Sequence, residues 1–170
     1  QLASAVGGAP GTATTMVKAL AESGLVEYEP YLGVRLSSAG TKLAALVLRR
    51  HRLIEQFLVE IMGMSWAEVH EDAEQLEHVV SDRLMERIDE VLGHPVVAPH
   101  GDPIPGPDGR IASDNSQTLV DVAPGSAATV ERVLTQDEAF LSYADAHGLR
   151  PGRQVTVLSQ AAIAQSLTVQ

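Results

Sequence analysis

The sequence predicts a mainly helical protein with a smaller β part, and three observations carry that prediction. Apolar residues recur at helical spacing as far as about residue 93. A segment rich in proline, glycine and aspartate follows over residues 94–117. Short runs of β-forming residues separated by turn residues fill the remainder. We therefore expect helices first, then an irregular connector, then a small β domain over residues 118–170.

The N-terminal segment has the spacing of a helix-turn-helix. Residues 1–6 are expected to be the end of one helix, and Gly7 and Gly8 a turn. Pro10 suits the first position of a second helix, because its missing N–H costs nothing there. Gly24 is expected to stop that helix. Because Gln1 falls inside a helix, we expect the sequence to be a fragment.

A β-hairpin is expected directly after this second helix. Residues 25–29 and 34–36 form two short alternating runs, and residues 30–33 between them contain Pro30 and Gly33. A hairpin in this position is a wing. Residues 1–38 are therefore predicted to form a winged helix-turn-helix whose first helix is incomplete.

Three further helices are expected within residues 39–93. Ser37 or Ser38 can cap a long helix that runs to about Met62, where Gly63 ends it. Residues 65–68 (Ser-Trp-Ala-Glu) fit a capping box that opens another helix. Ser81 can cap a third helix, which is followed by glycine and proline at residues 93 and 95.

The third of these helices carries an apolar stripe, and two interpretations of it are equally favoured. The stripe can belong to the core of one chain, or it can be the interface of a homodimer. Its members are Leu84, Ile88, Val91 and Leu92.

Beyond the connector, β-like runs are expected over residues 118–122, 128–134, 154–158 and 167–169. A short helix is expected over residues 137–147. We expect this small β domain to be cut before its last strands.

Composition and charge exclude some classes of protein. Cysteine is absent, which excludes disulfides and thiolate metal sites and suits a reducing cytoplasm. No stretch approaches the roughly 20 apolar residues of a membrane span. The net charge of −10 divides into +3 over residues 1–52 and −13 over the remainder. A mildly basic head is compatible with phosphate binding, and an acidic body favours cations. The six basic residues of the first segment are Lys18, Arg35, Lys42, Arg49, Arg50 and Arg52.

Histidines and carboxylates recur at helical spacing in the two central helices. One set shares a helical face at i, i+4, i+7 and i+8, and the preceding helix adds an i, i+4 pair. Each set alone could be a solvated polar face. Together, five or six nitrogen and oxygen donors without sulfur favour Mn²⁺, Fe²⁺ or Zn²⁺. The predicted metal ligands are His51, Glu55, His70, Glu74, Glu77 and His78.

Enzyme motifs nearly match here but fail. Residues 70–74 lack the second histidine of the HExxH zinc-protease pattern, and Gln75 stands where a di-iron Glu-x-x-His motif needs glutamate. We expect no catalytic residues and no organic substrate. Two alternatives stay open: a metal-binding enzyme with a dinuclear carboxylate–histidine centre, and a metal transport accessory protein. His94, His100 and His147 are expected to have surface or structural roles.

The second helix is a candidate recognition helix for double-stranded DNA. Its first turns carry small hydroxyl side chains, which allow close entry into the major groove, and two basic residues can reach phosphates. The plain alternative is an amphipathic structural helix. The predicted DNA-binding residues are Pro10, Thr12, Thr14, Thr15, Lys18 and Arg35.

At these residues the sequence resembles the diphtheria toxin repressor family of metal-dependent regulators, and is closest to its manganese-responsive branch. The resemblance covers nearly the whole chain and is most specific at residues 10–20, 24–31, 33–36, 51–55, 70–78 and 101–105. It implies a winged helix, a helical dimerisation and metal domain, and a small C-terminal β-barrel like that of ferrous-iron transport accessory proteins.

The resemblance also implies roles for residues. His51, Glu55 and His70 match an ancillary metal site, and Glu74, Glu77 and His78 match the primary, regulatory site. Glu74 stands where iron-sensing members carry cysteine, which favours Mn²⁺ over Fe²⁺ or other divalent metals. The primary site is expected to be incomplete without the family's first helix. Loosely matched further donors in the barrel are Glu131, Gln136, Asp137 and Glu138.

The function implied is repression of metal-homeostasis genes in the cytoplasm. Mn²⁺ or Fe²⁺ acts as co-repressor, and a homodimer binds palindromic operator DNA. Acid pH is expected to weaken repression because the histidine ligands become protonated.

Overall fold

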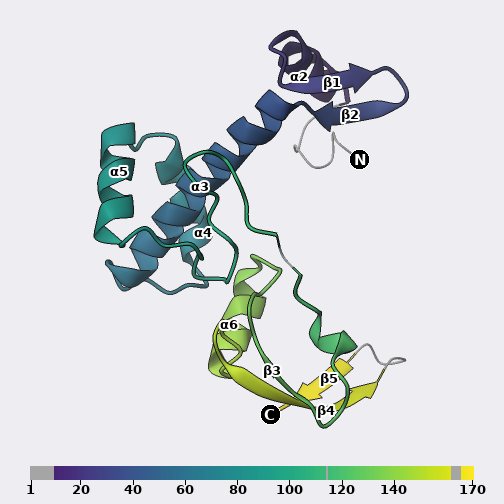
Figure 1. Cartoon of the computed structure of the whole chain (residues 1–170), viewed down its shortest axis with the longest axis vertical. Coiled ribbons are helices and arrows are strands. Elements are labelled where there is room, and N and C mark those ends of the chain that lie inside the picture. The colour runs from purple at the N-terminus through teal and green to yellow at the C-terminus, as the bar shows by residue number, and fades with distance from the viewer. Residues whose placement is uncertain (1–9, 114, 162–165) are drawn as a thin grey trace.

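The computed structural model describes residues 10–113, 115–161 and 166–170, which form three successive parts (Figure 1). The head contains α2 (Pro10–Glu22), β1 (Val26–Glu29) and β2 (Gly33–Leu36). The helical core contains α3 (Ser38–Glu60), α4 (Val69–Glu77) and α5 (Asp82–Val91). The C-terminal unit, residues 118–170, contains the 3₁₀ turn η1 (Leu119–Asp121), β3 (Ala127–Thr129), α6 (Glu138–Ala146), β4 (Gln154–Ala161) and β5 (Ser166–Val169).

The head follows the prediction over the part of it that is described. α2 begins at Pro10, and Gly24 adopts the left-handed conformation at φ 71° that closes its C-terminus. The Leu25 N–H then donates to the Leu20 carbonyl at 2.9 Å. β1 and β2 pair antiparallel as the expected wing. The predicted helix at residues 1–6 and the turn at Gly7–Gly8 lie outside the described residues.

The head meets the helical core at the start of α3. Ser37 caps α3 by accepting from the Gly40 N–H, and its hydroxyl donates to the Gly24 carbonyl at 2.7 Å. A Cβ added to Gly40 would lie 1.9 Å from the Leu25 carbonyl oxygen. The first turn of α3 therefore packs against the head at a distance that only glycine permits.

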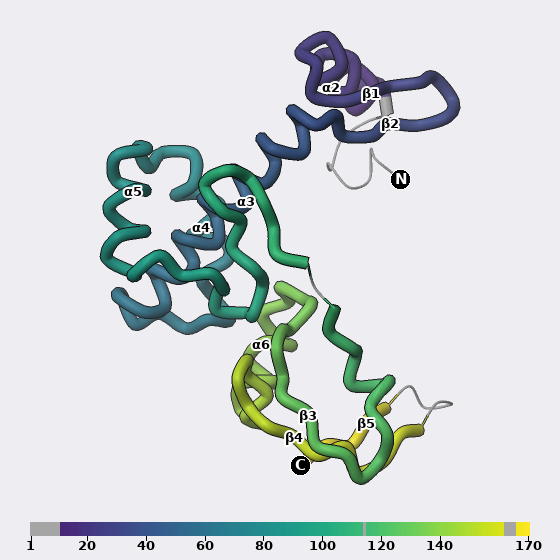
Figure 2. The backbone as a smooth tube through the Cα atoms, viewed as in Figure 1, coloured from purple at the N-terminus to yellow at the C-terminus, as the bar shows by residue number. Residues whose placement is uncertain are grey.

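The core forms where α4 and α5 pack on the second half of α3. Apolar side chains of all three helices are buried together, and two residues of the connector, Ala98 and Ile104, complete the cluster. The Arg49 and Arg52 guanidinium groups donate to the carbonyls of Pro105 and Pro103. The first half of the connector is thus packed on α3, although it contains no helix or strand (Figure 2).

One predicted helix start was wrong. Ser65 does not open a helix, because residues 66–68 form turns and α4 begins only at Val69. Trp66 and Ala67 are buried, 3 % and 4 % exposed, against side chains of the C-terminal unit. This tertiary packing outweighs the local capping signal. The predicted caps Ser37 and Ser81 and the stop at Gly63 are confirmed.

The apolar stripe of α5 serves the core on one side and remains open on the other. Ile88 is buried, and Leu92 packs against the core. Leu84 and Val91 are 49 % and 50 % exposed and line a groove of 260 Å³. Leu84 and Val91 therefore remain available to pack against another protein surface.

The C-terminal unit differs from the expected barrel. Its described strands form an open three-stranded antiparallel sheet in the order β3-β4-β5. The expected strand at residues 118–122 is instead η1, because the Thr118 hydroxyl and backbone N–H both donate to Asp121. β3 is only three residues long, whereas α6 forms as expected, capped by Asp137.

The structure revises the charge argument for the head. Arg49, Arg50 and Arg52 lie in the second half of α3 and form ion pairs within the core and connector. Their partners are Asp89 at 2.6 Å, Asp82 at 2.9 Å and Asp102 at 3.3 Å. Three of the six basic residues counted toward the head thus neutralise acids elsewhere. Across the described ranges, no helix is long and apolar enough to cross a membrane.

Candidate metal centre

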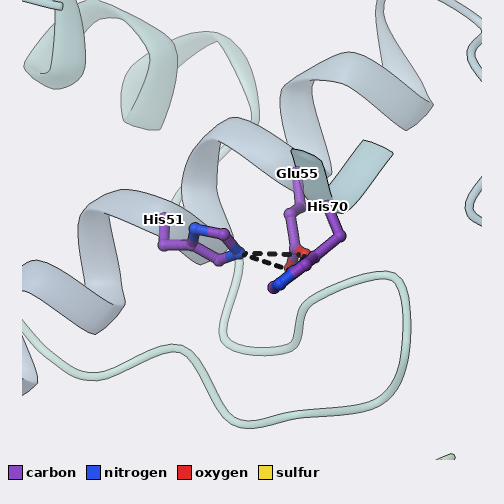
Figure 3. A group of neighbouring side chains, drawn as sticks. All are labelled: His51, Glu55 and His70. Atoms are coloured by element: carbon purple, nitrogen blue, oxygen red, sulfur yellow. Dashed lines mark hydrogen bonds and ion pairs between the residues drawn. The ribbon is translucent and has the colours of Figure 1, made fainter. Parts of the chain in front are cut away.

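Three predicted ligands converge between α3 and α4 (Figure 3). His51 and Glu55 are one turn apart on α3, and His70 faces them from the first turn of α4. Glu55 Oε1 lies 3.1 Å from His51 Nε2 and 3.2 Å from His70 Nδ1. The two imidazole nitrogens are 3.2 Å apart. One donor atom from each residue can be chosen so that all lie within 4.8 Å of one another.

Burial and charge shape the acid–base state of this cluster. Glu55 is 2 % exposed. Burial favours a higher pKa for Glu55, but hydrogen bonding and charge from His51, with His100 and His70, hold the pKa below its ordinary value of 4.5. Burial likewise favours a lower pKa for His51, yet the carboxylates of Glu55 and Glu77 raise its pKa above 6.5. The buried carboxylate is stabilised by positive charge.

A divalent cation fits this donor set. One buried carboxylate and two imidazoles, aimed at a common point from two helices, are ligands of Mn²⁺, Fe²⁺ and Zn²⁺. The buried carboxylate of Glu55 requires positive charge nearby. In the described structure His51, whose pKa is raised, provides this charge, and a bound cation would provide it as well.

The other three predicted ligands are not gathered into a second cluster within the described residues. Glu77 lies at the edge of the first cluster, with Oε2 2.8 Å from His51 Nδ1. Its other oxygen is 3.7 Å from Nε2 of His78, whose side chain is 71 % exposed. Glu74 is exposed. These three side chains follow one another along α4 and its C-terminal end.

His100, for which the sequence predicts a surface or structural role, also lies at this site. It lies in the connector, is fully buried, and places Nδ1 3.9 Å from Glu55 Oε2. Oε2 is the carboxylate oxygen opposite the one that His51 and His70 approach. The apolar residues Ala98 and Ile104 around it were the available sign that this segment is packed rather than free.

A groove of 670 Å³ connects the metal centre to the head. Leu20, Leu25 and Leu36 line it from the head. Residues from the first half of α3 line its middle, and His51, His70, Glu74 and Glu77 line its far end. The candidate ligands therefore face the space between the head and the core.

Five of the six predicted DNA-binding residues are exposed on the surface of the head. Ala13 and Val17 face inward and are buried. Thr12, Thr14, Thr15 and Lys18 are exposed on α2, and Arg35 is exposed on β2. Pro10 is the first residue of α2.

The four suggested donors of the C-terminal unit are not part of the cluster in the described structure. Glu131 accepts a hydrogen bond from the Ser116 hydroxyl, and Asp137 caps α6. Gln136 and Glu138 are exposed.

Models of two protein families match the chain. Residues 37–106 match the iron dependent repressor, metal binding and dimerisation domain, and residues 117–170 match the FeoA domain. The first match contains His51, Glu55 and His70, and also His100 in the first half of the connector.

Curated relatives match most of the chain. The iron-dependent repressor IdeR of Mycobacterium leprae is 33 % identical over 158 residues, which cover 86 % of this chain and 69 % of that repressor. The diphtheria toxin repressor of Corynebacterium efficiens is 30 % identical, with 88 % and 69 % covered. The chain belongs to the diphtheria toxin repressor family.

Solved structures of this family support the same assignment. A manganese-dependent transcriptional repressor in complex with manganese superposes with a TM-score of 0.90 at 41 % identity, covering 99 % of this chain and 77 % of that one. ScaR with bound Cd²⁺ gives 0.83 at 32 %, covering 99 % and 79 %. The diphtheria toxin repressor family is one of metal-dependent transcriptional regulators. The family resemblance, the fold class and a metal-dependent regulatory function are thus confirmed, and the relatives are named for the two predicted metals, iron and manganese.

Proposed function

We propose that this chain is a Mn²⁺-responsive repressor whose His51–Glu55–His70 cluster is a metal site that helps to control operator binding. The observation that carries the proposal is the convergence of these three donors, from two helices, within 4.8 Å. When bound, a divalent cation would offset the charge of Glu55 and join α3 to α4. Fe²⁺ is the alternative metal.

Glu74 supports manganese as the preferred metal. It lines the same groove as Glu77, His51 and His70, and the sequence has no cysteine. Hard carboxylate oxygen suits Mn²⁺ better than a thiolate site would. We place Glu74, Glu77 and His78 in a second site, as the family resemblance implies.

A homodimer bound to operator DNA is the form in which we expect the protein to act. The exposed side of α5, with Leu84 and Val91, belongs to the matched dimerisation domain. The hydroxyl-bearing face of α2 would then enter one major groove in each half of a palindromic site. A protein acting on chromosomal DNA is expected in the cytoplasm.

The control of DNA binding would follow from the groove between head and core. His51, His70, Glu74 and Glu77 line its far end, and head residues line its near end. A cation bound by the ligands at the far end of the groove stabilises a given position of the head only if the protein binds the cation more tightly with the head in that position. By linkage, operator DNA then tightens metal binding by the same factor.

The metal site can be tested by measuring free Mn²⁺ by electron paramagnetic resonance during titration of the whole chain. Glu55→Gln and His70→Gln are expected to weaken binding at least about tenfold, since each removes a donor. His147→Gln, a histidine at the exposed end of α6, serves as the matched control. Equal affinity of Glu55→Gln and the control would show that the cluster is not a metal site.

Regulation can be tested on duplexes selected from a random pool in the presence of Mn²⁺. Addition of a chelator is expected to release the DNA, and Mn²⁺ or Fe²⁺ to restore binding. DNA affinity that ignores both chelator and metal would exclude a co-repressor role.

A further inference from the structure

The C-terminal end of α4 contacts two consecutive residues of α3, Arg50 and His51. The Arg50 Nε–H donates to the main-chain carbonyl of Glu77 at 2.6 Å. His51 Nδ1 lies 2.8 Å from Oε2 of the same glutamate. One residue of α3 therefore holds the backbone of Glu77, and the next residue holds its side chain.

Helix geometry explains why the Glu77 carbonyl needs a partner from another element. The last four carbonyls of an α-helix have no partner within the helix. At the end of α4, the N–H groups of Val79 and Val80 both donate to the Leu76 carbonyl, at 3.1 and 3.0 Å. The next carbonyl, that of Glu77, accepts from Arg50. The last turn of α4 contains no basic residue, so the Arg50 guanidinium also provides the positive charge that a helix C-terminus favours.

The same guanidinium reaches the start of α5. Its Nη1 lies 2.9 Å from Oδ1 of Asp82, the first residue of that helix. The Asp82 side chain is 95 % exposed, so solvent screens this ion pair and the pair contributes little energy. The hydrogen bond from Arg50 to the Glu77 carbonyl is partly buried, and is therefore the stronger of the two interactions.

This hydrogen bond lies at the second candidate metal site. Glu77 is the last residue of α4, and His78 is the residue that follows it. The backbone at this point sets the directions in which both side chains leave the chain. Helix ends open more easily than helix interiors, so a bond to the Glu77 carbonyl limits the range of positions that the two side chains can adopt.

We propose that Arg50 is a positioning residue for the second site, because it holds the end of α4 so that Glu77 and His78 can bind the metal together. This inference rests on the proposed second site. A guanidinium has hydrogen-bond donors only, so Arg50 is no ligand. Its charge taken alone repels a cation, and its role therefore lies in the hydrogen bond to the Glu77 carbonyl.

Three substitutions separate this hydrogen bond from the charge. Arg50→Gln places an amide N–H at the position of Nε and removes the charge. Arg50→Lys keeps the charge and can still reach Asp82, but it has a methylene group at the position of Nε. Arg50→Met, which has the length of glutamine, has neither. Arg110→Met is the matched control, since Arg110 forms an exposed ion pair with Asp108 in the connector at 3.2 Å.

We expect two classes of Mn²⁺ site when free Mn²⁺ is measured by electron paramagnetic resonance during titration of the whole chain. Arg50→Lys and Arg50→Met should weaken the class that Glu77→Gln weakens by at least about tenfold, the lower end for residues that orient metal ligands. Arg50→Gln and Arg110→Met should bind Mn²⁺ as the wild type does.

Other results of this titration would overturn the proposal. Affinity retained in Arg50→Lys and lost in Arg50→Gln would show that the charge is what matters. Wild-type affinity in all three variants, with Glu77→Gln impaired, would exclude the positioning role and leave the second site standing. Equal affinities of wild type and Glu77→Gln would overturn the second site as well, whereas Glu55→Gln tests the first site separately.

Amide hydrogen exchange without metal gives an independent readout. The N–H groups of Val79 and Val80 should exchange faster in Arg50→Lys and Arg50→Met than in the wild type, and at nearly the wild-type rate in Arg50→Gln. Leu53 and Ile54, which are buried in α3, report on the core. Equal acceleration at both places would mean that Arg50 supports the whole core rather than the end of α4, and would overturn the proposal.

Discussion

Glu55 is the residue on which the candidate centre depends. It occupies the buried face of α3, between Leu53, Ile54 and Leu58, where helical periodicity alone would place an apolar side chain. Burial of a carboxylate is costly unless charge and hydrogen bonds compensate. Three imidazoles provide that compensation, from His51, His70 and His100. We therefore expect Glu55 to serve binding rather than packing.

The pH dependence of the metal-free protein should reflect this pairing. Because the pKa of His51 is raised in the folded protein, its protonated imidazole stabilises the fold fully below pH 6.5. This contribution is lost as pH rises through the folded-state pKa. The lowered pKa of Glu55 stabilises the fold above pH 4.5, and this is lost as pH falls through its folded-state pKa. Both contributions are therefore present together between pH 4.5 and 6.5.

His51→Gln is expected to lower the free energy of unfolding by about 1.5–3 kcal/mol in that window, the range for hydrogen bonds to charged groups, and by less at higher pH. Urea denaturation of the metal-free chain at several pH values measures this. The other ionisable groups near the pair are Glu77, His70 and His100. With Mn²⁺ present, the pH dependence of this destabilisation is expected to reverse. His51→Gln should then lower the stability more at higher pH, because protons on His51 compete with the metal at lower pH. A destabilisation that does not vary with pH would contradict the pairing.

At the scale of elements, the junction between the head and α3 depends on Gly40. The contact with the Leu25 carbonyl oxygen leaves no room for a side chain, and Ser37 ties the same turn to Gly24. In this structure, backbone contacts therefore set the position of the head on the first turn of α3.

Gly40→Ala is expected to destabilise the chain by about 1–3 kcal/mol, because the added methyl group forces the backbones apart. Gly11→Ala in α2 is the matched control, since nothing lies within 4 Å of an added Cβ there. It should be neutral or stabilise by about 0.4–1 kcal/mol. Urea denaturation monitored by circular dichroism distinguishes the two, and equal effects would show that the head is not packed at Gly40.

The elements with strong local signals were predictable from the sequence. Pro10, Gly24, Ser37 and Ser81 each act within one or two turns of their position in the chain, and the structure uses each as expected. The start of α4 was not predictable, because Trp66 is buried by residues more than 60 positions away. η1 was mistaken for a strand because two hydrogen bonds to Asp121 outweigh β propensity.

The candidate site was predictable to the extent that helical spacing places donors together. His51 and Glu55 are one turn apart, so only the approach of α4 was needed to add His70. His100 could not be found in this way, since a Pro- and Gly-rich segment has no periodicity that indicates which side chain points inward. The basic character of the head was also wrongly inferred, because ion pairs between distant residues cannot be seen in a count.

At the scale of the whole molecule, the groove beside α5 is the surface on which we expect dimerisation to depend. Leu84→Glu places a charge in a groove lined by Ile54, Phe57 and other apolar residues. The dissociation constant of the dimer should rise at least about tenfold, because the interface would bury a carboxylate among apolar side chains, and Arg87, which also lines the groove, is already paired with Glu90. Leu158→Glu in β4, where the leucine is 48 % exposed, is the matched control. Light scattering after gel filtration measures both, and a dimer unaffected by Leu84→Glu would exclude this surface.

The length of α3 determines how far a small change in the core is carried. Its 23 residues extend about 35 Å, with the head at one end and His51 and Glu55 toward the other (Figure 1). Over such a lever arm, a tilt of about 10° at the core displaces the head by about 6 Å, half of the roughly 12 Å width of a major groove. A small change in the tilt of α3 at the core therefore determines whether the two heads of a dimer can enter two major grooves at the same time.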